Sequence, residues 1–152
     1  MGNRGSGGEE RVLTYAYVED GMTAQGIKIP DIPIVYLVIQ VGRLRARGPA
    51  IVDTGFDGGI YPNFEIVRLF EGMKPLRVVE FENPIYGRSE FEVYEADAYL
   101  YHEGTYISIG KVNVYIPTEP ELLTGEVLIG REVLNRWRLA LNSPNGHLSI
   151  FL

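Results

Sequence analysis

Short apolar runs separated by turn residues extend along the chain from residue 12, and this pattern constrains the fold more than any other feature. The runs are rich in Val, Ile, Tyr and Phe, which favour the pleated, half-buried surface of a strand. Gly, Pro and Asn separate the runs and favour turns. The pattern therefore predicts a mostly β chain, with strands at residues 12–18, 34–41, 50–53, 77–82, 89–100, 106–116, 127–129, 139–142 and 147–151.

Two brief segments indicate helices instead. Residues 63–70 follow Pro62, and Pro favours a first helical turn because its ring presets φ. Residues 131–136 follow Gly130 and form a second short amphipathic run. We therefore expect an all-β fold with one short helix after Gly130 and a second near residues 63–70.

The last residues are typical of a hairpin. Residues 139–142 and 147–151 flank a turn that contains Asn145 and Gly146, a pair that tolerates positive φ. The second strand is apolar and ends the chain, so an unpaired edge there would promote aggregation. A partner subunit would cover such an edge. Residues 12–18 would either extend a dimer sheet or pack on the core.

Length and composition favour one domain without a nucleic-acid partner. A chain of 152 residues has the size of one domain, so we expect a flexible Gly-rich tail at residues 1–10 and a single domain over residues 11–152. The net charge is -6, and Lys and Arg form no run with interleaved aromatics, which argues against a nucleic-acid-binding face. No stretch approaches the roughly 20 apolar residues of a membrane span, and the N-terminus lacks the apolar segment of a signal peptide. The default expectation is a soluble, cytoplasmic protein.

Three other kinds of site find no support in the residues. The chain has no cysteine, so a disulfide framework, a thiolate zinc site and a thiol nucleophile are excluded. The two histidines, His102 and His147, lack metal-ligand spacing. Residues 55–59 are glycine-rich, but no Lys-Ser or Lys-Thr follows them as in a phosphate-binding loop. We therefore expect neither a metal nor another cofactor.

An apolar run at residues 50–52 ends in Asp53-Thr54-Gly55, and this tripeptide occurs once. The run predicts a buried strand, followed by a sharp turn that holds the Asp53 carboxylate against an apolar wall. Aspartic proteases present a catalytic carboxylate in this way, with two such groups facing each other across one water. Two carboxylates about 3 Å apart repel by about 5 kcal/mol at an effective dielectric near 20, so the pair shares one proton. A chain with one such loop supplies half of the pair. Either it dimerises, or the tripeptide is an ordinary turn after a strand.

A second motif lies near the C-terminus, where an apolar run at residues 127–129 is followed by Gly130, Arg131, Glu132 and Val133-Leu134. In the retropepsin-like aspartic proteases, Asp-Thr-Gly is followed later in the chain by an apolar pair, Gly, Arg, Asp or Asn, and a Leu-Leu-like pair. A terminal hairpin comes after these residues. The chain therefore resembles this family from about residue 34 onward, its cellular prokaryotic members more than the viral ones. It departs from the family in having Glu132 and Val133. The resemblance implies a closed or partly open β-barrel.

The resemblance also implies roles for the residues of both motifs. Asp53 would be the catalytic residue, one from each subunit of a homodimer, with no cofactor. Thr54 would bind the other subunit's loop across the dimer axis, although a hydroxyl that serves only its own turn is the alternative. Gly55 would let the substrate backbone approach closely. Asp57 would pair with Arg131 and brace the active-site loop.

A flap is implied as well, a hairpin that closes over the substrate and excludes water. Residues 77–94 are the candidate, with a turn at residues 83–87 that lacks the multi-glycine tip of the viral enzymes. Candidate substrate-binding residues, each also explicable as core or turn, are Phe56, Gly58, Ile60, Ile85 and Tyr86.

These motifs favour a homodimeric aspartic endopeptidase that acts on an extended peptide or unfolded protein. One alternative keeps the fold but uses it as a dimerisation or peptide-binding module with weak or absent cleavage. Another is an unrelated β-barrel binding protein in which Asp53 only ends a strand. Cleavage that a statine-type transition-state analogue inhibits would distinguish the first function from the other two.

Overall fold

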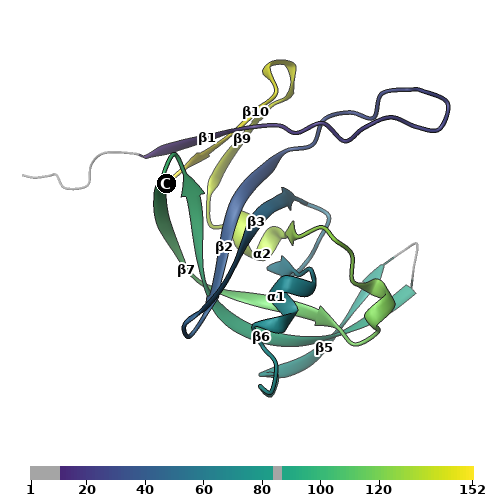
Figure 1. The fold of residues 1–152 in the computed structure, drawn as a ribbon, viewed down its shortest axis with the longest axis vertical. Coiled ribbons are helices and arrows are strands. Elements are labelled where there is room, and N and C mark those ends of the chain that lie inside the picture. Colours follow the sequence, from purple (N-terminus) through teal and green to yellow (C-terminus); the bar gives the residue numbers. More distant parts are fainter. Residues whose placement is uncertain (1–10, 84–86) are drawn as a thin grey trace, which may run out of the picture. The chain divides into compact units, whose positions relative to one another are not determined.

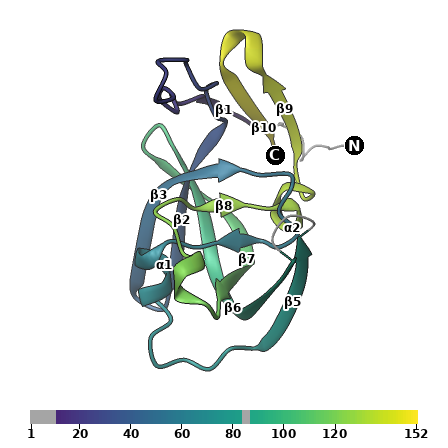
Figure 2. The same cartoon turned by 90° about the vertical axis from the view of Figure 1, so that its right-hand side faces the viewer.

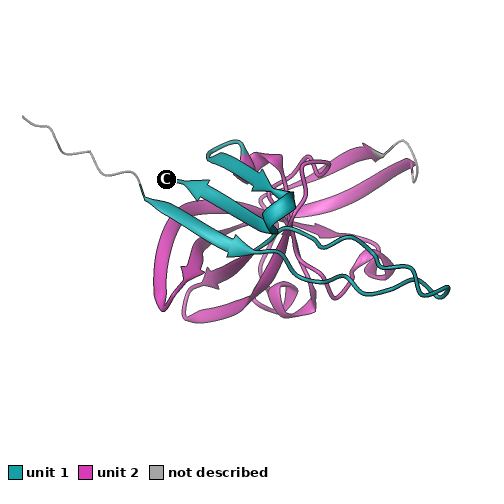
Figure 3. Ribbon diagram, turned by 90° about the horizontal axis from the view of Figure 1, so that it is seen from above, with its two compact units in different colours: residues 1–34, 135–152 teal, residues 35–134 magenta. Residues whose placement is uncertain are grey.

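The computed structural model describes residues 11–83 and 87–152 and consists mostly of β-strands (Figure 1). The chain divides into two compact units, residues 1–34 with 135–152 and residues 35–134 (Figure 3). Among the described residues, no helix is both long and apolar enough to cross a membrane. The predicted all-β fold is confirmed. The single domain stays a prediction, and the predicted tail lies outside the described residues.

The first unit is built on a three-stranded antiparallel sheet, in the order β1-β10-β9. Alternation along β1 and β10 buries Leu13, Tyr15, Leu148 and Ile150 on one face of this sheet. The strands are β1 (Val12–Ala16), β9 (Arg138–Asn142) and β10 (His147–Phe151).

The terminal hairpin forms as predicted, but the chain itself covers its last strand. A 3₁₀ turn, η3 (Ser143–Asn145), joins β9 to β10, and Gly146 follows it in the left-handed conformation, with φ of 66°. β10 is the central strand of the sheet, because β1 pairs with its other edge from Val12 opposite Phe151 to Ala16 opposite His147. No partner subunit is therefore needed to cover β10; of the covers that the sequence allows, the chain uses its own strand β1.

Seven strands with residues in the second unit form one sheet, which closes on itself (Figure 2). Their order is β2-β3-β8-β4-β7-β6-β5, and an additional pairing of β2 with β6 closes a ring of six strands, with β5 outside it. The unit is therefore a β-barrel. The strands are β2 (Ile34–Val41), β3 (Leu44–Val52), β4 (Ile60–Tyr61), β5 (Arg77–Asn83), β6 (Gly87–His102), β7 (Thr105–Pro117) and β8 (Leu128–Ile129).

The long strand β6, with 16 residues, takes part in both the ring and a projecting hairpin. Its residues 87–93 pair with β5, and its residues 97–100 pair with β2. β7 pairs along β6 with a bulge between Ala98 and Tyr99. A bulge increases local twist, which lets a strand curve around a barrel. The first half of β6 and β5 thus form the hairpin that the sequence predicts over residues 77–94.

Both predicted helices are present in the second unit and are shorter than expected. α1 (Phe64–Arg68) is capped by Asn63, whose Oδ1 accepts a hydrogen bond from the Ile66 amide at 3.1 Å. α2 (Arg131–Leu134) buries its last two residues. The core of this unit is made of branched apolar side chains that are less than 2 % exposed. They include Val35, Val38, Ile39, Ile60, Val93, Leu100, Val112, Val114, Ile129 and Val133.

The sequence does not predict two stretches of strand. β3 begins at Leu44, before its expected start at residue 50. In its first half the exposed Arg45 and Arg47 flank the buried Ala46, as alternation along a strand requires. This half contains few apolar residues, so the sequence pattern does not indicate a strand there. β4 has only two residues, which is shorter than any periodic run that indicates a strand.

Candidate active site

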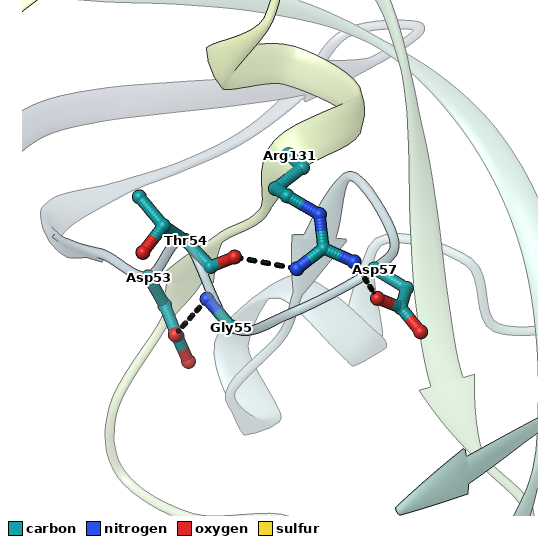
Figure 4. A network of polar contacts seen from close by, with 5 residues as sticks. All are labelled: Asp53, Thr54, Gly55, Asp57 and Arg131. Atoms are coloured by element: carbon teal, nitrogen blue, oxygen red, sulfur yellow. Dashed lines mark hydrogen bonds and ion pairs between the residues drawn. The ribbon is translucent and has the colours of Figure 1, made fainter.

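The Asp53-Thr54-Gly55 loop lies beside the Gly130-Arg131 loop because the strands before them pair in parallel. Ile51 is opposite Leu128 and Val52 is opposite Ile129. The pairing continues into the loop, where the Asp53 amide donates to the Ile129 carbonyl at 2.9 Å. Parallel strands end at the same edge of a sheet, so two motifs far apart in sequence emerge next to each other (Figure 4).

Asp53 is held by a tight turn of its own loop. The Gly55 amide donates to Asp53 Oδ1 at 2.9 Å, and the Phe56 amide donates to the Asp53 carbonyl at 3.2 Å. Asp53 is half-buried and lines a cleft whose lining includes aromatic side chains. A Cβ on Gly55 would lie 3.2 Å from Asp53 Oδ1, which means that a larger residue would crowd the carboxylate.

Arg131 links the two loops. Its Nη1 donates to the Thr54 carbonyl at 2.6 Å, and its Nη2 forms an ion pair with the Asp57 carboxylate (Figure 4). The side chains of Arg131 and Asp57 are 44% and 48% exposed, so the pair contributes about 0–1 kcal/mol to stability. Its main physical effect is therefore to orient the loop. The contact that the resemblance implies is present, and its catalytic role stays a prediction.

Backbone hydrogen bonds reinforce this link. The amides of Gly130, Arg131 and Glu132 donate to the carbonyls of Gly59, Phe56 and Gly58, at 2.7, 2.9 and 3.2 Å. Such close approach of two backbones requires glycine. A Cβ on Gly130 would lie 2.2 Å from the Gly58 carbonyl oxygen and 2.7 Å from that of Phe56. The predicted loop and the predicted helix start thus form one rigid unit.

Among the described substrate-binding candidates, Gly58 and Ile60 do not line the cleft. Gly58 is buried, and a Cβ there would lie 2.7 Å from the Phe56 ring and 2.8 Å from the Tyr115 ring. Two other candidates, Ile85 and Tyr86, lie outside the described residues. Ile60 is 0 % exposed and belongs to the core. Phe56 is the candidate that lines the cleft.

Glu132 occupies a position whose function the sequence does not reveal. Its Oε1 accepts a hydrogen bond from Asn113 Nδ2 at 2.9 Å, and its Oε2 accepts one from the Tyr115 hydroxyl at 2.6 Å. Burial and, to a lesser degree, the hydrogen bond to Glu132 raise the pKa of Tyr115 to about 12. Glu132 therefore ties α2 to β7. The one signal in the sequence is that Glu replaces the Asp or Asn of the family.

A cleft of about 490 Å³ opens in front of Asp53, within the second unit. Three segments enclose it: the active-site loop, the hairpin of β5 and β6, and the chain between η2 (Pro120–Leu122) and β8. The lining residues are Asp53, Gly55, Phe56, Asp57, Tyr61, Phe81, Glu82, Ser89, Phe91, Glu121, Leu122, Thr124, Glu126 and Leu128.

Aromatic contacts join the hairpin of β5 and β6 to the active-site loop. The ring centroid of Phe56 lies 6.1 Å from that of Phe81 and 5.7 Å from that of Tyr61. Tyr61 is 5.9 Å from Phe91, and its hydroxyl donates to the Leu122 carbonyl at 2.5 Å. Such edge-to-face pairs contribute about 0.5–1.5 kcal/mol each beyond burial. All three walls of the cleft are therefore joined through one cluster.

Thr54 is exposed, and its carbonyl, not its hydroxyl, faces Arg131 (Figure 4). Within residues 11–83 and 87–152 its hydroxyl makes no hydrogen bond, so the local-turn alternative for this hydroxyl finds no support there. Over the same residues, no three His, Cys, Asp or Glu side chains gather as metal ligands would.

Comparisons with known proteins give one structural likeness. No protein-family model and no curated protein sequence matches the chain. Among solved structures, the chain is similar to a retropepsin-like aspartic protease from Rickettsia conorii, with 11% sequence identity and a TM-score of 0.47. The alignment covers 95% of this chain and 98% of that chain. A likeness at this identity concerns the course of the backbone and not the chemistry of the site.

Proposed function

We propose that the protein is a homodimeric aspartic endopeptidase in which Asp53 of each subunit activates one water molecule. The observation that carries the proposal is the place of the Asp53 carboxylate, which lines a cleft of about 490 Å³ on a loop held by Arg131. This combination supplies a carboxylate, a rigid support and room for a peptide.

The chemistry needs two carboxylates that share one proton. The ionised group takes a proton from water, and the water oxygen attacks the peptide carbonyl carbon. The protonated group donates a hydrogen bond to the carbonyl oxygen as negative charge develops there. When the tetrahedral intermediate collapses, the C–N bond breaks and the nitrogen leaves with a proton from the pair.

The second carboxylate would come from a second copy of the chain. The nearest acid in sequence, Asp57, is already paired with Arg131 and is not available for this role. The exposed Thr54 hydroxyl, which has no hydrogen bond to a described residue, supports a contact between the loops of two subunits. The hairpin of β5 and β6 would be the flap, because Phe81 and Phe91 line the cleft.

Replacing Asp53 with Asn tests the proposal. Asn keeps a side-chain oxygen that accepts from the Gly55 amide, so the loop keeps its turn while it loses the acid. We expect cleavage of an unfolded protein between pH 3 and 7 to fall by about 10²–10⁴-fold, the usual contribution of a general acid or base. Wild-type cleavage should also be inhibited by a statine-type transition-state analogue.

The matched control is Asp97→Asn, which makes the same chemical change in an exposed ion pair with Lys111 outside the cleft. That variant should keep full activity. Equal turnover of Asp53→Asn and the wild type would contradict the proposal. Binding of the analogue without any cleavage by the wild type would assign the alternative, a peptide-binding module.

A further inference from the structure

The cleft in front of Asp53 is acidic. Of the described residues that line it, five are carboxylates and none is Lys, Arg or His. Asp57 is compensated by Arg131, and Glu82 is compensated by Arg88, whose Nη2 lies 3.2 Å from its carboxylate. Glu121 and Glu126 have no cationic partner among the described residues, and both are exposed. Two uncompensated charges thus stand at the cleft in addition to Asp53.

Apart from Ser89, Thr124 and Gly55, the rest of the cleft lining is apolar. Four aromatic rings and two leucines form this apolar part. In the segment from η2 to β8, two acids lie close in sequence to apolar residues: Glu121 is next to Leu122, and Glu126 is two residues before Leu128. The hydrogen bond from Tyr61 to the Leu122 carbonyl holds this segment against the aromatic cluster. An occupant would therefore meet apolar surface and negative charge together. The apolar wall consists of Phe56, Tyr61, Phe81, Phe91, Leu122 and Leu128.

On the basis of the proposed function, we infer that this cleft selects peptide segments that carry a lysine or arginine beside a large apolar residue. The long aliphatic part of Lys or Arg lies along apolar surface while its charged end reaches a carboxylate. An acidic peptide would meet like charge without a compensating cation. Glu121 and Glu126 are the residues that would set this preference. Anionic partners such as nucleic acid are disfavoured by the same charges.

The expected selectivity follows from the energy of exposed ion pairs. Each such pair changes affinity by about 1.4- to 5-fold, so two give roughly 2- to 25-fold. The effect of these ion pairs on peptide affinity should weaken as the salt concentration rises, because exposed charges are screened over about 10 Å at 0.1 M ionic strength.

Three peptides of the same length test the inference: one places Lys beside Phe, and the other two replace Lys with norleucine or Glu. We expect kcat/KM of the 152-residue protein to fall in the order Lys, norleucine, Glu, with a total difference of roughly 2- to 25-fold. The double variant Glu121→Gln with Glu126→Gln should level the three values. The matched control, Glu71→Gln with Glu95→Gln, removes two exposed charges of the same unit outside the cleft and should keep the order.

Failure of this inference and failure of the proposed function give different results. Equal kcat/KM for the three peptides, or an order that survives the double variant at the cleft, would overturn the charge selectivity and leave the peptidase intact. If no peptide is cleaved, the proposed function fails. Titration with the same three fluorescently labelled peptides then decides the selectivity, because binding in the order Lys, norleucine, Glu supports it and equal affinity overturns it.

Discussion

At the scale of single residues, glycine decides how the two loops of the candidate site approach each other. Gly130 and Gly58 bring their backbones close enough for a Gly130 Cβ to overlap the Gly58 carbonyl oxygen, at 2.2 Å. Two of the three nearest atoms, the carbonyl oxygens of Gly58 and Phe56, belong to the backbone and cannot rotate away as the end of a side chain could. Glycine at these positions thus allows the loop that carries Asp53 to lie against the Gly130 loop.

We expect Gly130→Ala to destabilise the protein by about 1–3 kcal/mol, the usual cost of forcing an extra methyl group into a packed site. The measurement is the free energy of unfolding from urea titration. Gly48→Ala is the matched control, because no atom lies within 4 Å of a Cβ built there, and its effect should stay within about 0.5 kcal/mol. Equal changes in the free energy of unfolding for the two substitutions would contradict the prediction, because the two loops would then accommodate a methyl group at Gly130 without cost.

At the scale of elements, Glu132 joins α2 to β7. Its two oxygens accept from Asn113 and Tyr115, both on β7, while its own amide donates to the Gly58 carbonyl. Hydrogen bonds of this one residue therefore connect the helix, the strand and the active-site loop. A shorter Asp at this position would reach neither partner without a shift of the helix.

Tyr115→Phe tests this link through its pH dependence. At pH 8 the variant should be less stable by about 1–3 kcal/mol, because Glu132 loses a buried donor. The pKa of Tyr115 is raised from 10.0 to about 12 in the folded protein, so its stabilising effect is complete below pH 10 and is lost as pH rises to 12. The difference between wild type and variant should therefore shrink over this range.

Urea titrations at pH 8, 10 and 11.5 measure that difference. The other nine of the ten tyrosines are present in both proteins, so their titration cancels in the comparison. A difference that stays constant from pH 8 to 11.5 would mean that Tyr115 does not titrate differently in the folded state.

At the scale of the whole molecule, the chain has one Asp-Thr-Gly loop, so under the proposed function it would supply one of the two carboxylates that the chemistry needs. The terminal strand does not demand a partner, since β1 and β9 pair with both edges of β10. The reason to propose a second copy thus lies in the chemistry of the candidate site and not in an unpaired β10.

If the active site forms between two copies, activity per chain should fall upon dilution below the dimer dissociation constant. The measurement combines specific activity at decreasing concentration with sedimentation at the same concentrations. Adding excess Asp53→Asn chains should also lower wild-type activity, because each mixed dimer holds a single acid. A fully active species that sediments as a monomer would contradict the dimer.

Much of the fold could be predicted from the sequence because strands carry a local signal. The alternation of residues along β2, β6, β7 and β10 and the turn at Gly146 depend on near neighbours only, and so does the start of α2 after Gly130. Strand β3 is predicted late because outward arginines interrupt its apolar pattern, and β4 is too short to have one. The two motifs, and through the family resemblance the pair of Asp57 with Arg131, also belong to what the sequence determines.

Contacts between distant segments were decided by the tertiary structure alone. β1 pairs with β10, although most of the chain lies between them in sequence. Glu132 accepts a hydrogen bond from Tyr115, and Phe56 packs against Phe81 of the hairpin. The cleft and its uncompensated Glu121 and Glu126 exist only because barrel closure brings three segments to one edge. The physical reason is that periodicity reports which face of a strand is buried, whereas its neighbours depend on how the whole sheet curves and closes.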